Sequence, residues 1–80
     1  MKAKIHVTLK SGILDPQGKA IEHALETLGF TSANNVRMGK YLEVDLKETT
    51  KGRAEAEVKA MCEKLLANTI IEEYRYELAG

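Results

Sequence analysis

Few residues in this chain are of the kinds that do chemistry, and they are scattered along the sequence. It has two histidines, His6 and His23, and one cysteine, Cys62. A metal site needs several such side chains or carboxylates close together. A nucleophilic Ser or Cys needs a positioned base beside it, and Ser11 has no such partner nearby in the sequence. The residues therefore predict neither a metal site nor a catalytic residue in this chain.

Basic residues and glycines could instead hold a phosphate. Lys10, Gly12, Arg37, Gly39 and Lys40 all fall in or near expected loops. They form no glycine-rich phosphate motif, and an aspartate occupies the helix start that a phosphate would need. An intrinsic anion site is therefore the weaker interpretation, and outward charges facing a charged partner are the stronger one.

The whole chain sets further limits on function. Its 80 residues contain 12 Lys and Arg against 12 Asp and Glu, so the net charge is zero, which argues against nucleic-acid or anionic-membrane binding. No apolar run approaches the roughly 20 residues of a membrane span. A single cysteine excludes an internal disulfide. We expect one domain, residues 1–80, in the cytoplasm, with a small core that association with another chain would supplement.

The first half of the chain predicts a strand and then a helix. Strict alternation over residues 3–10 puts four apolar side chains on one face, as in a half-buried strand. Asp15 is the expected N-cap of a helix over residues 16–28, with Pro16 at its first position. Gly29 supplies the left-handed residue that ends it. An apolar stripe at three- and four-residue spacing marks the buried face of this helix.

The second half predicts a hairpin, a helix and a last strand. Alternation over residues 36–38 and 42–46 indicates two strands, and parity favours a three-residue loop or bulge around Gly39 over a single bent strand. Thr49 or Thr50 is the expected N-cap of a second helix, whose apolar face includes Cys62 and Leu65. The last strand covers roughly residues 70–78. The order βαββαβ predicts an α+β, ferredoxin-like fold, a four-stranded antiparallel sheet with both helices on one face.

Several blocks of this sequence, taken in order, resemble the PurS family, the small subunit of phosphoribosylformylglycinamidine (FGAM) synthase. They are Leu9-Lys10, Leu14-Asp15-Pro16-Gln17-Gly18, Leu28-Gly29-Phe30, Val36-Arg37-Met38-Gly39-Lys40 with Glu43, Cys62-Glu63-Lys64-Leu65-Leu66-Ala67-Asn68 and Ile71-Glu72-Glu73-Tyr74. The resemblance covers nearly the whole chain. One departure is Thr69, where many relatives are expected to have proline.

The resemblance implies a non-catalytic subunit in de novo purine biosynthesis. It implies a complex that uses ATP and Mg, with a glutaminase subunit, a large synthase subunit, and this chain as a homodimer or dimer of dimers joining them for ammonia transfer. No cofactor is expected in the chain itself. A stand-alone, dimeric metabolite-binding regulatory domain is the alternative. The residues expected to bind partners are Lys10, Gly12, Ile13, Leu14, Asp15, Gln17, Arg37, Gly39, Lys40 and Tyr41.

Overall fold

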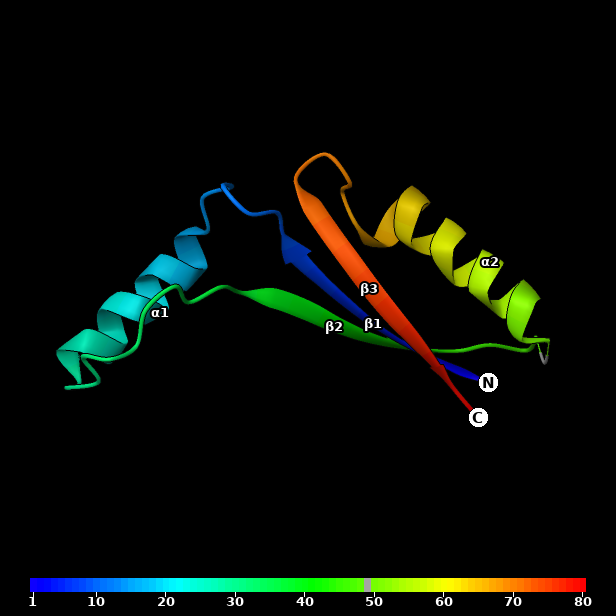
Figure 1. Cartoon of the computed structure of the whole chain (residues 1–80), viewed down its shortest axis with the longest axis horizontal. Coiled ribbons are helices and arrows are strands. Elements are labelled where there is room, and N and C mark those ends of the chain that lie inside the picture. The colour runs from blue at the N-terminus through cyan, green and yellow to red at the C-terminus, as the bar shows by residue number, and fades with distance from the viewer. Residues whose placement is uncertain (49) are drawn as a thin grey trace.

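The computed structural model describes residues 1–48 and 50–80 and has an elongated α+β fold (Figure 1). Its elements are β1 (Lys2–Leu9), α1 (Pro16–Thr27), β2 (Gly39–Asp45), α2 (Lys51–Met61), a π-helical turn η1 (Cys62–Leu66) and β3 (Glu72–Ala79). The Cα trace extends 49 Å along its longest axis and 14 Å along its shortest. The α+β class is confirmed.

Three strands form the sheet in the described residues, in the order β2-β1-β3, and both pairings are antiparallel. β1 lies in the centre, and it is half-buried as its alternating sequence predicts. Ala3, Ile5 and Val7 are buried on one face, whereas Lys4 and His6 lie on the other. The backbone N–H of Leu46 donates to the carbonyl of Met1 at 2.7 Å, which continues the β1–β2 contact beyond the strand ends.

The predicted hairpin around Gly39 is wrong, and with it the fourth strand. Gly39 to Asp45 form one continuous strand that pairs with β1 from Thr8 back to Lys2. Val36 and Met38 form no ladder, because their N–H groups donate to the carboxylates of Glu22 and Asp15. The less favoured single strand is what the structure shows, and β2 is an edge of the sheet.

The core lies between α2 and one face of the sheet. Among the described residues, eight hydrophobic side chains are buried there: Ala3, Ile5, Val7, Leu46, Ala54, Val58, Cys62 and Ala67. Half-buried side chains of β3, among them Tyr74 and Tyr76, pack against them. Thr50 is the N-cap residue of α2 but makes no side-chain cap bond, and the alternative cap, Thr49, lies outside the described residues.

The π-helical turn changes the end of the second helix. The N–H of Ala67 donates to the carbonyl of Cys62 five residues earlier, at 3.0 Å. This wider turn shifts the phase of the side chains. Leu65, expected on the buried face, is therefore 82% exposed, while Leu66 packs against the core.

Both helices were expected on one face of the sheet, and this is wrong for α1. In Figure 1, α2 lies beside β3, whereas α1 extends beyond the end of the sheet, side by side with the chain that leads into β2. The apolar stripe of α1 therefore lacks a cover within the described chain: Ile21 and Leu28 are exposed, and Leu25 is only partly buried. We call α1 together with residues 28–38 the arm.

Candidate functional site

The corner between β1 and α1 is organised by the carboxylate of Asp15. The residue has an extended backbone and one carboxylate oxygen accepts the N–H of Gly18 at 2.8 Å, as an N-cap does. The other oxygen accepts the N–H of Met38 at 2.6 Å. Asp15 is only 4% exposed. One side chain thus caps α1 and fastens it to a segment more than twenty residues later.

The surroundings of Asp15 keep it ionised. Hydrogen bonds from the backbone of Gly18 and Met38 lower the pKa of the Asp15 carboxyl, and the positive charge of Arg37 adds to this effect. Burial acts in the opposite direction but is outweighed. The carboxylate of Asp15 is therefore a structural element of the corner, and its interaction with a partner remains a prediction.

Other contacts make the arm a unit of its own. The N–H of Val36 donates to the carboxylate of Glu22 on α1 at 3.2 Å. Gly18 is buried where α1 meets this segment, and a side chain on Gly18 would collide with the carbonyl oxygen of Val36. Gly29 ends α1 with φ of 99°, and the N–H of Phe30 donates to Leu25, as a Schellman ending requires.

Arg37 connects the arm to the end of β1. Its Nη2 donates to the carbonyl of Lys10 at 3.1 Å, and the N–H of Ile13 donates to the same carbonyl at 3.1 Å. Gly12 has φ of 87°, a left-handed conformation that suits glycine. Leu14 is 70% exposed at this turn. The corner therefore presents an apolar side chain next to a guanidinium group.

The structure divides the predicted site residues into two groups. Six of them gather at the corner: Lys10, Gly12, Ile13, Leu14, Asp15 and Arg37. Gln17 is exposed on the first turn of α1. The remaining three, Gly39, Lys40 and Tyr41, lie at the start of β2 and line a separate hollow on the sheet. For all ten residues, contact with a partner remains a prediction.

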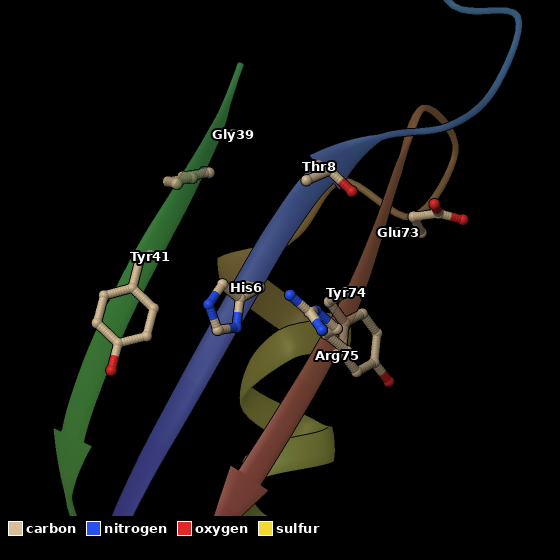
Figure 2. A pocket seen from close by; sticks show the side chains of 8 residues that line it. His6, Thr8, Gly39, Tyr41, Glu73, Tyr74 and Arg75 are labelled. Atoms are coloured by element: carbon tan, nitrogen blue, oxygen red, sulfur yellow. The ribbon is translucent and has the colours of Figure 1, made fainter. Parts of the chain in front are cut away.

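The hollow lies on the face of the sheet that α2 leaves open (Figure 2). It has a volume of about 500 Å³, and its lining includes His6, Thr8, Tyr41, Glu73 and Arg75. Pairing in the sheet places Tyr41 and Arg75 on either side of His6. The rings of His6 and Tyr41 are 4.8 Å apart. Sequence reasoning missed Arg75, although the alternation in β1 and β3 could have aligned it with His6.

Next to the hollow, charged side chains pair across the strands. The hydroxyl of Tyr41 donates to Glu43 at 2.8 Å, and Lys2 reaches the same carboxylate at 3.3 Å. These two hydrogen bonds lower the pKa of Glu43, and the bond to Glu43 raises the pKa of the Tyr41 hydroxyl. The carboxylate of Glu43 is thus already occupied within the chain.

Neither group of residues has the composition of a metal centre. Over residues 1–48 and 50–80, no group of three or more His, Cys, Asp or Glu side chains lies close enough to hold a metal ion. Cys62 is buried, and burial raises the pKa of its thiol. No helix among the described residues is long and apolar enough to cross a membrane.

Comparison with known proteins settles the family. The family model for PurS, described as phosphoribosylformylglycinamidine (FGAM) synthase, matches residues 2–80. The chain belongs to the PurS family. A PurS subunit of phosphoribosylformylglycinamidine synthase from Bacillus subtilis is 48% identical over 77 residues, covering 96% of this chain and 90% of that protein. The corresponding Synechocystis subunit is 41% identical over 77 residues, covering 96% and 77%.

Solved PurS structures share the fold. The B. subtilis PurS structure superposes with a TM-score of 0.88 and 48% identity, covering 99% of this chain and 98% of that one. A chain in the structure of PurLQS from Thermotoga maritima gives a TM-score of 0.87 at 33% identity, covering 95% and 93%. The three-stranded arrangement with a projecting α1 is therefore that of PurS proteins.

Proposed function

We propose that this chain is the small, non-catalytic subunit of FGAM synthase in de novo purine biosynthesis. The match to the PurS family over residues 2–80 carries this proposal. The T. maritima PurLQS structure supports a place in a larger complex. In the proposed complex, which we place in the cytoplasm, a glutaminase subunit releases ammonia and a synthase subunit uses it with ATP and Mg. This chain holds the two together, which favours transfer of ammonia over its loss to water.

The proposal includes a homodimer, or a dimer of dimers. Two features of the single chain support this. The apolar stripe of α1 is exposed at Ile21 and Leu28, although apolar area removed from water stabilises a fold by about 25 cal/mol per Å². In addition, β2 pairs only with β1 in the described residues, so its outer edge has backbone groups able to pair with another strand. A second copy placed at this edge would cover both.

The corner is the proposed contact with the larger subunits. Leu14 offers an exposed apolar side chain and Arg37 a neighbouring positive charge, and large apolar residues and arginine are enriched at interfaces. The hydrogen bonds of Asp15 and Arg37 fix the geometry of the turn in advance. A preformed turn loses little entropy when a partner binds.

The test is reconstitution of the three purified subunits with Leu14→Asp or Arg37→Glu in this chain. We expect loss of the complex by mass measurement, and loss of glutamine-dependent turnover while turnover with added ammonia persists. Leu65→Asp and Arg53→Glu are matched controls, because both residues are exposed on the other helical segment. Complexes that form equally well with the corner variants would remove the corner from the interface.

A further inference from the structure

The open face of the sheet has hydrogen-bond donors without acceptors. Arg75 lines the hollow, and Figure 2 shows its guanidinium group pointing from β3 toward β1 and His6. Within the described residues, neither side chain makes a hydrogen bond or ion pair with another residue. Thr8 lies two residues further along the same face of β1. These side chains line a hollow of the size that small ligands occupy.

The shape of the hollow follows from Gly39. It pairs with Thr8, and a Cβ on Gly39 would lie 2.8 Å from the methyl carbon of Thr8 and 2.7 Å from the carbonyl oxygen of Val7. Because Gly39 has no side chain, the hollow is open on the part of β2 that lies opposite Thr8. The half-exposed ring of Tyr41 forms one wall and Arg75 the other.

The acidic residues near the hollow form no ion pair with Arg75 among the described residues, although the charges of Glu43 and Glu77 both raise the pKa of the Tyr41 hydroxyl. Glu43 is engaged with Lys2 and the hydroxyl of Tyr41. Figure 2 shows the carboxylate of Glu73 pointing away from His6. Glu77 lies one row further on, directly opposite Lys4.

Lys4 precedes His6 on the same face of β1, with Glu43 and Glu77 as its neighbours across the strands. A guanidinium group beside an imidazole, with no carboxylate bound to either, suits a ligand that is itself negative.

We propose that this hollow is an anion site that binds a phosphate group, with Arg75 and His6 as the principal donors and Thr8 completing the contact. Arginine presents paired N–H groups that match phosphate oxygens, and protonated imidazole adds a charged donor. The source of the phosphate group is either free inorganic phosphate or a small phosphate ester. This site is separate from the corner, and it does not rest on the proposed subunit function.

The chain provides its own internal control, because it has only two histidines. His6 lies in the hollow, whereas His23 lies on α1, which is beyond the end of the sheet. The imidazole C–H resonances of the full chain can be followed by NMR at fixed pH as sulfate is added. Sulfate serves as the probe because its charge is constant near neutral pH. Sodium chloride at equal ionic strength corrects for screening.

We expect added sulfate to shift the resonances of His6 in a saturable way and to leave those of His23 unchanged, because only His6 lies in the hollow. At fixed pH, inorganic phosphate and AMP then distinguish the sources. If inorganic phosphate saturates the site and AMP does not, the ligand is the free ion. If AMP binds at least tenfold more tightly than inorganic phosphate, the ligand is an ester that also contacts Tyr41.

Arg75→Gln tests the geometry, with Arg53→Gln on α2 as the matched control. Removing a charged donor weakens binding by about tenfold, since such hydrogen bonds are among the strongest in proteins. The control variant should bind as the original chain does. Equal responses of His6 and His23, or an Arg75→Gln variant that binds unchanged, would overturn the proposal.

Discussion

The glycine at position 18 tests whether α1 is fastened to the arm as described. Replacing glycine by alanine within a helix ordinarily stabilises it, by up to about 1 kcal/mol, because alanine loses less backbone entropy. Gly18 is the third residue of α1, so propensity alone favours Gly18→Ala. The structure predicts the opposite, because the added methyl would collide with the carbonyl oxygen of Val36.

The expected magnitude combines these two effects. Forcing a methyl group into a packed site costs about 1–3 kcal/mol. Movement of Val36 would also weaken the hydrogen bonds that Glu22 and Asp15 accept from this segment. Taking about 2 kcal/mol for the collision and about 1 kcal/mol for the weakened hydrogen bonds, and subtracting about 1 kcal/mol of helix propensity, leaves α1 destabilised by about 2 kcal/mol.

Hydrogen exchange of individual backbone amides is the suitable assay, because it reports the opening of each helix separately. A loss of about 2 kcal/mol corresponds to roughly 30-fold faster exchange in α1. Gly52→Ala in α2 is the matched control, since a methyl there would meet nothing within 4 Å. Exchange in α2 should slow by about two- to fivefold. If α1 of Gly18→Ala exchanged as slowly as in the original chain, the close packing of Gly18 against Val36 would be refuted.

Two further predictions concern titratable groups. Because the pKa of Asp15 is lower in the folded chain than in the unfolded one, its contribution to stability is fully present above about pH 4 and is lost as the pH falls through the folded value. Amide exchange in α1 between pH 3 and pH 6 should show this acid loss, and Asp15→Asn should remove it while weakening the arm at neutral pH. Cys62 has no exposed surface and a raised thiol pKa, so a thiol reagent should label it only at the rate at which the core opens. Labelling should accelerate with urea, and rapid labelling of the folded chain would contradict the burial of this residue.

Local patterns predicted much of the fold because they depend on contacts within a few residues. The alternation of β1 and the capping of α1 by Asp15 and Gly29 are confirmed. The failures arise where distant side chains intervene. Val36 and Met38 alternate like a strand, but side-chain carboxylates take their N–H groups. Leu65 fits the spacing of the apolar face of an α-helix, but the π-helical turn places its side chain on the exposed side.

The position of α1 could not be predicted for a different reason. An apolar stripe indicates that a face is covered, but not whether the cover comes from the same chain or another. Ile21 and Leu28 follow the expected spacing and remain exposed in the single chain. The hollow around His6 was missed because it depends on the register of β1 with β2 and β3, which places Tyr41 and Arg75 opposite His6 and is not specified by the pattern of any one strand.

The small size of the interior has a consequence for how a cell must supply this protein. Eight buried hydrophobic residues among residues 1–48 and 50–80, four of them alanine or cysteine, are few for a chain of 80. A copy produced in excess of its proposed partners has an exposed apolar helix face and a small core, so it unfolds and is degraded readily. If the proposed complex forms, the abundance of this chain should follow that of the partner subunits, with surplus copies degraded.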